Sequence, residues 1–392
     1  MSTTRPAAAP ATGAEPLPSQ REKFDVDDGV AYFNTANLSP VLKRVREAGE
    51  AALARRSKPW SYVASDWFAD GEKLRGLRAS LLGVPADDVA FVPSTSYGLA
   101  AVGRNLRAKA GDRVLVLADE FPSNHYTWKR FTERTGATLV MVDRAPGQGW
   151  TTAILAAIDE RLVAASVPNV HWTNGALVDL PRVAAAVHQV GATFIIDASQ
   201  SLGVMPLDLA ALRPHAVVSV GYKWLLAPMS LGVLYLHPSL HDGEPLEENW
   251  ISRAGSDDFT RLVDYEDEYQ PGARRFDVGQ RSNFHLTPMA IAATEQILEW
   301  GVPRIAATLA LRTSAIAERA AALGFKVAPA GQRGPHILGL DLPESAAKRV
   351  AAALDAANVR VAFRGSSIRI APHLHNSQED VERLLGAIAL VV

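Results

Sequence analysis

Cysteine is absent from this chain of 392 residues. Its absence excludes disulfide bonds, cysteine-based metal sites and any mechanism with a cysteine nucleophile or a persulfide carrier. Long apolar runs are missing too, so we expect no transmembrane helix and no membrane partner. The charge is balanced, with 40 Lys and Arg against 42 Asp and Glu, which gives no electrostatic reason to expect nucleic acid as a partner. The ten histidines show no metal-ligand spacing, and we expect no metal site.

What remains is an ordinary composition, 48% hydrophobic and 21% charged, which fits a cytoplasmic globular protein. The first residues, MSTTRPAAAPATGAEPLPSQ, are rich in Ala and Pro and lack the apolar core and the cationic start of a signal peptide. We predict a flexible tail over 1–22, a large domain over 23–285 and a small C-terminal domain over 286–392.

Short β-rich runs alternate with helical patterns from about residue 88 onward. The runs are DVAFV, RVLVLA, TLVMVD, LVAASV, TFIID and AVVSV. This alternation predicts an α/β fold with a mostly parallel sheet and helices on both faces. Apolar residues at helical spacing predict helices over 40–56 and 66–83. The stretch 241–281 is polar and acidic, so we expect a long irregular segment outside the core, which we call the excursion. The helices and short strands after 286 predict a smaller α+β domain.

Lys223 follows a buried strand, in the stretch SVGYKWLLAP. Stranding an ammonium away from water costs several kcal/mol, so the residue needs an explanation. One interpretation is a lysine that leaves the strand and reaches solvent with its charged end. The other is an amine held uncharged in a dry pocket as a Schiff-base former.

Other polar or aromatic residues follow the neighbouring strands, where ligands gather in open α/β sheets. Ser94, Thr95 and Ser96 stand at a strand-to-helix turn, and they form either a phosphate cup or a simple helix cap. Asp197 follows TFII, and Gln200 comes three residues later. A buried carboxylate there would need a cationic or hydrogen-bonding partner, or else Asp197 only caps the next turn. The remaining residues are Phe121, which could belong to the core, and His171 and Asn174, which could be turn residues.

Together these residues would place a phosphate cup, a carboxylate, a flat aromatic and an amine at one sheet edge, which is what a pyridoxal phosphate site needs. The sequence resembles the class V aminotransferase branch of the fold-type I pyridoxal-phosphate enzymes. That branch includes cysteine desulfurases, selenocysteine lyase, kynureninase and isopenicillin N epimerase. The resemblance runs from YFNTANLSP through PSTSYGLA, EFPSNHY, DASQSLG, GYKWLLAP and RRFDVGQRSN to SIRIAPHLHN.

The resemblance implies a role for each matching residue. Lys223 would form the Schiff base with pyridoxal 5'-phosphate, Asp197 would pair with the pyridinium nitrogen and Phe121 would stack on the ring. Arg369 and Asn37 would bind the substrate, the arginine through the substrate carboxylate. The segment with Gln280 would reach the phosphate of a neighbouring subunit, which implies a homodimer. The other cofactor contacts implied are Ser94, Thr95, Ser96, Asn174, Gln200 and Tyr222.

Three positions depart from the family pattern. Tyr222 precedes the lysine where desulfurases have histidine, and its hydroxyl could contact the phosphate. Val220 stands three residues before the lysine, where relatives often carry a serine, and Gln280 stands where a threonine is usual. These departures affect the phosphate contacts.

The expected reaction acts at Cα of an α-amino acid, and we expect transamination. A C–S or Cβ lyase without a persulfide cysteine is the alternative, as is an epimerase, for which His125, Tyr126 or His171 would be the second base. A scaffold that keeps the fold without catalysis is a remote alternative. The sequence leaves the substrate side chain open.

Overall fold

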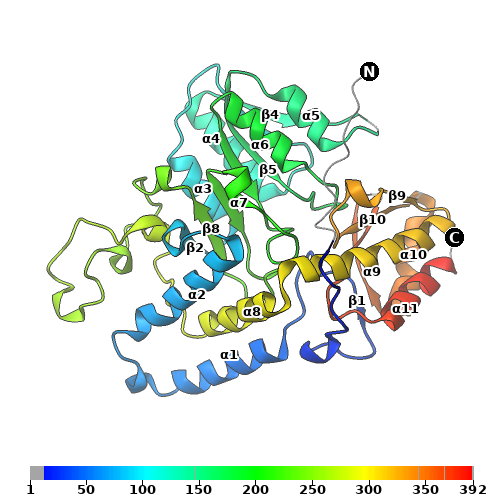
Figure 1. Ribbon diagram of the computed structural model, residues 1–392, viewed down its shortest axis with the longest axis horizontal. Helices are drawn as coiled ribbons and strands as arrows, with labels where there is room; N and C mark the ends of the chain where they lie inside the picture. Colours follow the sequence, from blue (N-terminus) through cyan, green and yellow to red (C-terminus); the bar gives the residue numbers. More distant parts are fainter. Residues whose placement is uncertain (1–12, 146, 343, 366, 391–392) are drawn as a thin grey trace.

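The computed structural model describes residues 13–145, 147–342, 344–365 and 367–390. A seven-stranded sheet forms its centre, in the order β2-β8-β7-β6-β5-β3-β4 (Figure 1). Strand β8 runs antiparallel to β2 and β7, and every other neighbouring pair is parallel. The expected mostly parallel sheet is therefore confirmed. Its strands are β2 Val89–Val92, β3 Arg113–Leu117, β4 Thr138–Val142, β5 Leu162–Pro168, β6 Thr193–Asp197, β7 Ala216–Ser219 and β8 Gly232–Leu236.

Alternate residues of these strands enter two different hydrophobic cores, because successive side chains of a strand point to opposite faces. In β3, Leu115 and Leu117 join the core on one face, whereas Val114 and Val116 join the core on the other. Both faces are thus buried, as their near-continuous apolar sequences indicate. The helices of this domain are α1 Lys43–Arg56, α2 Asp66–Leu82, α3 Thr95–Arg104, α4 Pro122–Thr135, α5 Trp150–Ala157, α6 Leu180–Gln189, α7 Leu209–Leu212 and α8 Leu286–Trp300.

The predicted helices over 40–56 and 66–83 correspond to α1 and α2 and pack against α8. The predicted excursion over 241–281 contains only short 3-10 turns and projects from the body of the molecule (Figure 1). No helix in the described part of the chain is both long and apolar enough to cross a membrane.

A second, smaller sheet of order β12-β13-β10-β9 forms the C-terminal part with α9, α10 and α11. Its core also takes Ala31 and Phe33 from the N-terminal segment, where β1 pairs in parallel with β11. The bounds are β1 Ala31–Tyr32, α9 Val302–Ala322, β9 Lys326–Val327, β10 Leu338–Asp341, α10 Glu344–Ala356, β11 Val359–Arg360, β12 Ala362–Arg364, β13 Ser367–Ile370 and α11 Gln378–Ala389.

The domain boundary at residue 286 stays a prediction, but the packing of α8 and α9 bears on its place. The buried side chains of α8 belong to the core of the large domain. Helix α9 contributes Ile305 and Leu309 to that core, and Ile316 and Ala320 to the core of the small domain. The N-terminal part of α9 therefore packs in the core of the large domain and its C-terminal part in the core of the small domain, so the helix joins both cores.

Part of the expected tail makes specific contacts with the body of the protein. The Leu17 backbone N donates to Thr308 Oγ1 at 2.8 Å. The side chain of Gln20 is buried, and its Oε1 accepts from Trp300 Nε1 at 2.9 Å. Residues 13–22 are thus placed against α8 and α9, contrary to the expected flexible tail, while 1–12 lie outside the described residues.

Candidate active site

The turn that carries Lys223 follows β7 and is shaped by close backbone packing. A Cβ at Gly221 would lie 2.3 Å from the Leu231 carbonyl oxygen, so the chain needs glycine there. Leu226, three residues after the lysine, has a φ of 53°, a left-handed conformation that costs energy for a branched side chain. The resulting turn keeps Lys223 only 6% exposed.

Lys223 lines a small pocket at the carboxyl ends of β5, β6 and β7. Its Nζ lies 5.1 Å from the centroid of the Phe121 ring, at the start of α4. Trp172 meets Phe121 edge-on, with ring centroids 5.6 Å apart. The other residues that line the pocket are Ser94, Thr95, Glu120, Ser123, Pro168, Val170, Asp197, Ser199, Gln200, Val220 and Tyr222.

The charges of Lys223 and Asp197 depend on one another. Burial lowers the pKa of Lys223 to about 8, although the negative charge of Asp197 opposes the shift. Burial also raises the pKa of Asp197, whose Oδ1 accepts from the Ser199 backbone N at 2.9 Å. The uncharged fraction of Lys223 near neutral pH is therefore a minor one, but it is far larger than for an exposed lysine, and the uncharged amine is the state that attacks an aldehyde.

The start of α3 gives the pocket its anion-binding end. Ser94 is the N-cap, and its Oγ accepts from the Tyr97 backbone N at 3.2 Å. Ser96 Oγ lies 2.9 Å from Ser94 Oγ, and Thr95 Oγ1 lies 3.0 Å from Ser199 Oγ. Capping is therefore observed, and it is compatible with anion binding because the first helical N–H groups still point outward.

These groups together fit pyridoxal 5'-phosphate. A buried amine with a lowered pKa, a carboxylate next to it, an aromatic face and the N-terminus of a ten-residue helix line one pocket. A carboxylate this deeply buried needs a cationic or proton-donating partner, which a pyridine nitrogen supplies.

Arg369, on β13, approaches the same region from the small domain. It is 1% exposed, its Nη1 donates to the Trp172 carbonyl oxygen at 2.8 Å and its Nη2 donates to Asn34 Oδ1 at 3.2 Å. Burial, with the charge of Arg364 second, lowers its pKa to about 10. Its Nε has no partner among the described residues. The guanidinium can therefore still receive a carboxylate.

The structure does not bring all the predicted site residues together. Asn37 is exposed, and the neighbouring Asn34 makes the contact with Arg369. Asn174 Oδ1 accepts from the Ala176 backbone N, and its side chain lines a different cavity, so the predicted ring contact is not supported. Gln280 lines a third cavity beside Trp67 and Trp250.

Gln200 lies in the pocket, yet both ends of its amide are engaged. Its Oε1 accepts from Trp224 Nε1 at 2.9 Å, and its Nε2 donates to the Ala36 carbonyl oxygen at 3.2 Å. Tyr222 also lines the pocket, and burial raises the pKa of its hydroxyl. Val220 fills the position of the expected serine with an apolar surface.

The three suggested second bases do not line the pocket. His125 and Tyr126 contact each other on α4, and Tyr126 is 62% exposed. His171 is stacked on Trp150 at 5.0 Å, and burial lowers its pKa to about 4.

Sequence reasoning missed Glu120, Ser199 and Trp172, which all line the pocket. Glu120 precedes Phe121 in the segment EFPSNHY, and Ser199 lies inside DASQSLG. Both motifs were identified from the sequence. The alternation of inward and outward residues holds only within a strand, so it does not predict which residues of the following loop turn inward. Only Trp172, within PNVHWTNG, had an aromatic ring as a signal.

Comparisons with known proteins agree with this fold. The family model described as "Aminotransferase class-V" matches residues 35–384. An uncharacterized aminotransferase YcbU from Bacillus subtilis is 27% identical over 360 residues, 91% of each chain. An apo cysteine desulfurase from Thermococcus onnurineus NA1 superposes with a TM-score of 0.84 at 21% identity, over 96% of this chain and 99% of that one. The cystine C-S lyase C-DES, in complex with its product cysteine persulfide, superposes with a TM-score of 0.81 at 17% identity, over 92% and 98%.

Proposed function

Since the chain belongs to the class-V aminotransferase family and is a pyridoxal-phosphate-dependent enzyme, we propose that it transfers the amino group of an α-amino acid. The observation that carries the proposal is the pocket of Lys223, which the buried amine shares with the buried carboxyl group of Asp197. Bound pyridoxal phosphate supplies an electron sink for the Cα of an amino acid attached to it.

Lys223 has two tasks in this proposal. As a neutral amine it would hold the cofactor aldehyde, and its freed Nζ would accept the proton that leaves Cα of the substrate. Asp197 keeps a proton on the ring nitrogen, because its ionised form is stabilised only by a positive partner in this buried place. Phe121 orients the ring, and the start of α3 with Ser94, Thr95 and Ser96 holds the phosphate.

Arg369 orients the substrate by its carboxylate. Its two occupied donors fix the plane of the guanidinium, so the group needs little reorganisation when an amino acid arrives. The planar fork matches a carboxylate with two parallel hydrogen bonds.

Transamination is favoured over epimerisation because none of the second bases suggested by the sequence lines the pocket. Both proton transfers of transamination need a single base on one face, whereas epimerisation needs another base on the opposite face. Lys223 lines the pocket, and His125, Tyr126 and His171 do not. The absence of cysteine excludes the persulfide mechanism. A lyase that releases its product directly remains the alternative.

We further propose that the enzyme is a cytoplasmic homodimer. Trp60, Val263 and Tyr265 are 80%, 76% and 92% exposed, near or on the excursion 241–281. Gln280, on the same side, would then face the active site of the partner subunit. Large exposed apolar side chains gathered in one region are typical of an interaction surface.

The visible absorption spectrum of the protein loaded with pyridoxal phosphate tests the reaction. We expect an amino acid to bleach the cofactor band and a 2-oxo acid to restore it. A band that persists while pyruvate or a sulfur product accumulates from a cysteine conjugate would contradict transamination and identify a lyase.

Lys223→Ala tests the residue on which the proposal depends. We expect the rate of amino-group transfer to fall by about a hundredfold or more, since that is the range for losing a general base. The control is Lys129→Ala, an exposed lysine of α4, which should leave the rate unchanged. A Lys223→Ala enzyme with the wild-type rate would rule out the assigned role.

A further inference from the structure

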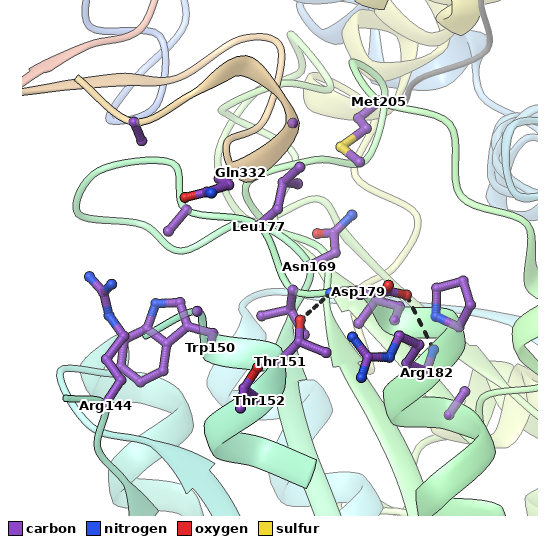
Figure 2. A pocket seen from close by; sticks show the side chains of 18 of the residues that line it. Arg144, Trp150, Thr151, Thr152, Asn169, Leu177, Asp179, Arg182, Met205 and Gln332 are labelled. Carbon is purple, nitrogen blue, oxygen red and sulfur yellow. Dashed lines mark hydrogen bonds between the residues drawn. The ribbon is translucent and has the colours of Figure 1, made fainter. Parts of the chain in front are cut away.

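A cavity much larger than the pocket of Lys223 lies apart from it. It has a volume of about 990 Å³ and lies between α5, α6 and α7 on one side and the small-domain segment 326–332 on the other (Figure 2). The proposed transamination assigns no task to it. Its size is ample for a small organic ligand.

One chain segment separates this cavity from the active site. After β5, Val170 and Trp172 line the pocket of Lys223, whereas Asn169, Asn174 and Leu177 line the second cavity. The segment is held by a bridge between Val170 and Leu177, and the Leu177 backbone N donates to the Gln332 carbonyl oxygen at 3.0 Å. The two cavities therefore lie on opposite sides of this segment, which forms a wall between them.

Two buried polar atoms on the second cavity lack a partner among the described residues. They are Asn169 Oδ1 and Trp150 Nε1, on side chains that are 2% and 3% exposed. Both faces of the Trp150 ring are covered, by His171 with ring centroids 5.0 Å apart and by the Arg144 guanidinium 4.9 Å away. Native proteins seldom leave such groups unpaired, but neither atom is accessible at the cavity surface, so a ligand would meet them only after a small shift of the wall.

The charges on the cavity favour an anion. Arg144, Arg182, Arg213 and Lys326 line it, and none has an ion pair within the described residues. By contrast, the carboxylates of Asp179 and Asp208 are engaged as the N-caps of α6 and α7. Asp341 also lines the cavity, so four cations face three carboxylates, two of which cap helices, and the balance of charge is positive.

We propose that this cavity binds a small organic carboxylate with an apolar body. The carboxylate would lie toward Arg182 and the other unpaired cations, and Asn169 would hydrogen-bond a polar group of the ligand. The apolar body would lie against Leu177 and Met205, which Figure 2 shows on the opposite wall from Arg182. Such a ligand would press on the back of the segment whose Trp172 carbonyl oxygen accepts from Arg369.

The probe for the test is 4-(trifluoromethyl)phenylacetate, followed by its ¹⁹F signal as it is titrated into the enzyme loaded with pyridoxal phosphate. We expect saturable binding that the uncharged amide of the same acid lacks. Arg182→Gln should bind the acid about fivefold more weakly, the loss expected for one partly exposed ionic contact. Arg107→Gln, which removes an exposed arginine elsewhere on the surface, should bind like the wild type.

A second variant separates this site from the substrate site. Arg369→Gln should keep the affinity for the probe, since Arg369 does not line the second cavity. Loss of binding in Arg369→Gln with none in Arg182→Gln would place the probe in the active site and overturn the proposal. The absence of saturable binding at millimolar concentration would overturn it as well. Neither result depends on whether the enzyme is an aminotransferase.

Discussion

Glu120 is the residue whose ionisation should affect stability most visibly. Burial, with the charge of Asp197 second, raises the pKa of its carboxyl to about 8. Its Oε1 accepts from the Phe121 backbone N at 2.8 Å, while its buried Oε2 has no partner among the described residues. The folded protein therefore binds a proton here that the unfolded chain, with a pKa near 4.5, releases.

The first prediction concerns Glu120→Gln in the cofactor-free protein. Because the folded pKa is the higher one, the native contribution of Glu120 is greatest below about pH 4.5 and is lost as the pH rises through about 8. The glutamine variant keeps a neutral side chain at every pH. Its free energy of unfolding relative to that of the wild type should therefore rise by more than about 1 kcal/mol as the pH increases over that range. Urea unfolding at a series of pH values measures it.

The control for this experiment is Glu47→Gln, at an exposed position of α1. Its stability difference from the wild type should not vary with pH in the same way. If Glu120→Gln and the wild type change in parallel across the whole range, then Glu120 is ionised in the folded protein and the argument is wrong.

Helix α3 positions the proposed phosphate site, and its distance from the sheet depends on a glycine. A Cβ at Gly98 would lie 2.7 Å from Val218 Cγ2 on β7, the strand that leads to Lys223. No real Cβ tolerates that distance, so the helix or the strand has to move. Glycine at this helical position is therefore explained by close packing and not by helix propensity.

The second prediction compares two glycine-to-alanine changes in helices. Gly98→Ala should destabilise the protein by about 1–3 kcal/mol through overpacking and weaken the binding of pyridoxal phosphate. Gly76→Ala, in α2, meets nothing within 4 Å and should stabilise by about 0.5–1 kcal/mol with unchanged cofactor binding. Thermal unfolding and cofactor titration measure both effects. Equal behaviour of the two variants would contradict the packing argument.

At the scale of the whole molecule, the excursion 241–281 carries large apolar side chains that are highly exposed in a single subunit. Trp250 and Phe259 pack against Trp67, which gives the excursion an anchor in α2. Val263 and Tyr265 lie beyond that anchor and face outward. This arrangement is suited to reaching a second copy of the chain.

The third prediction is that Val263→Asp weakens self-association. A carboxylate buried in an apolar interface lacks a partner, so the dimer should dissociate at a higher protein concentration and bind the cofactor less tightly. Leu390→Asp is the matched control, since Leu390 is 84% exposed near the C-terminus. Sedimentation velocity over a range of concentrations distinguishes them. A wild-type protein that sediments as a monomer, or a dimer unaffected by Val263→Asp, would contradict the proposed interface.

Some features of this protein follow from the sequence alone. The buried parallel strands follow from short apolar runs that alternate with helical patterns, because a strand covered on both faces needs apolar residues at every position. The family follows from the order of the motifs around Lys223 and Asp197. The absence of cysteine excludes a persulfide carried by an enzyme cysteine without any structure.

Other features were decided only by the tertiary structure. Loops decide which residues reach the site. They turn Glu120 and Trp172 into the pocket and place Asn174 on a different cavity. They also bring Asn34, and not Asn37, into contact with Arg369. A loop has no repeating pattern of exposure, so its sequence does not show which residue points inward. Contacts between distant parts of the chain likewise produce two further features. One is the helix α9, which joins both cores, and the other is the pair of cavities on either side of one segment. Such contacts exist only after folding.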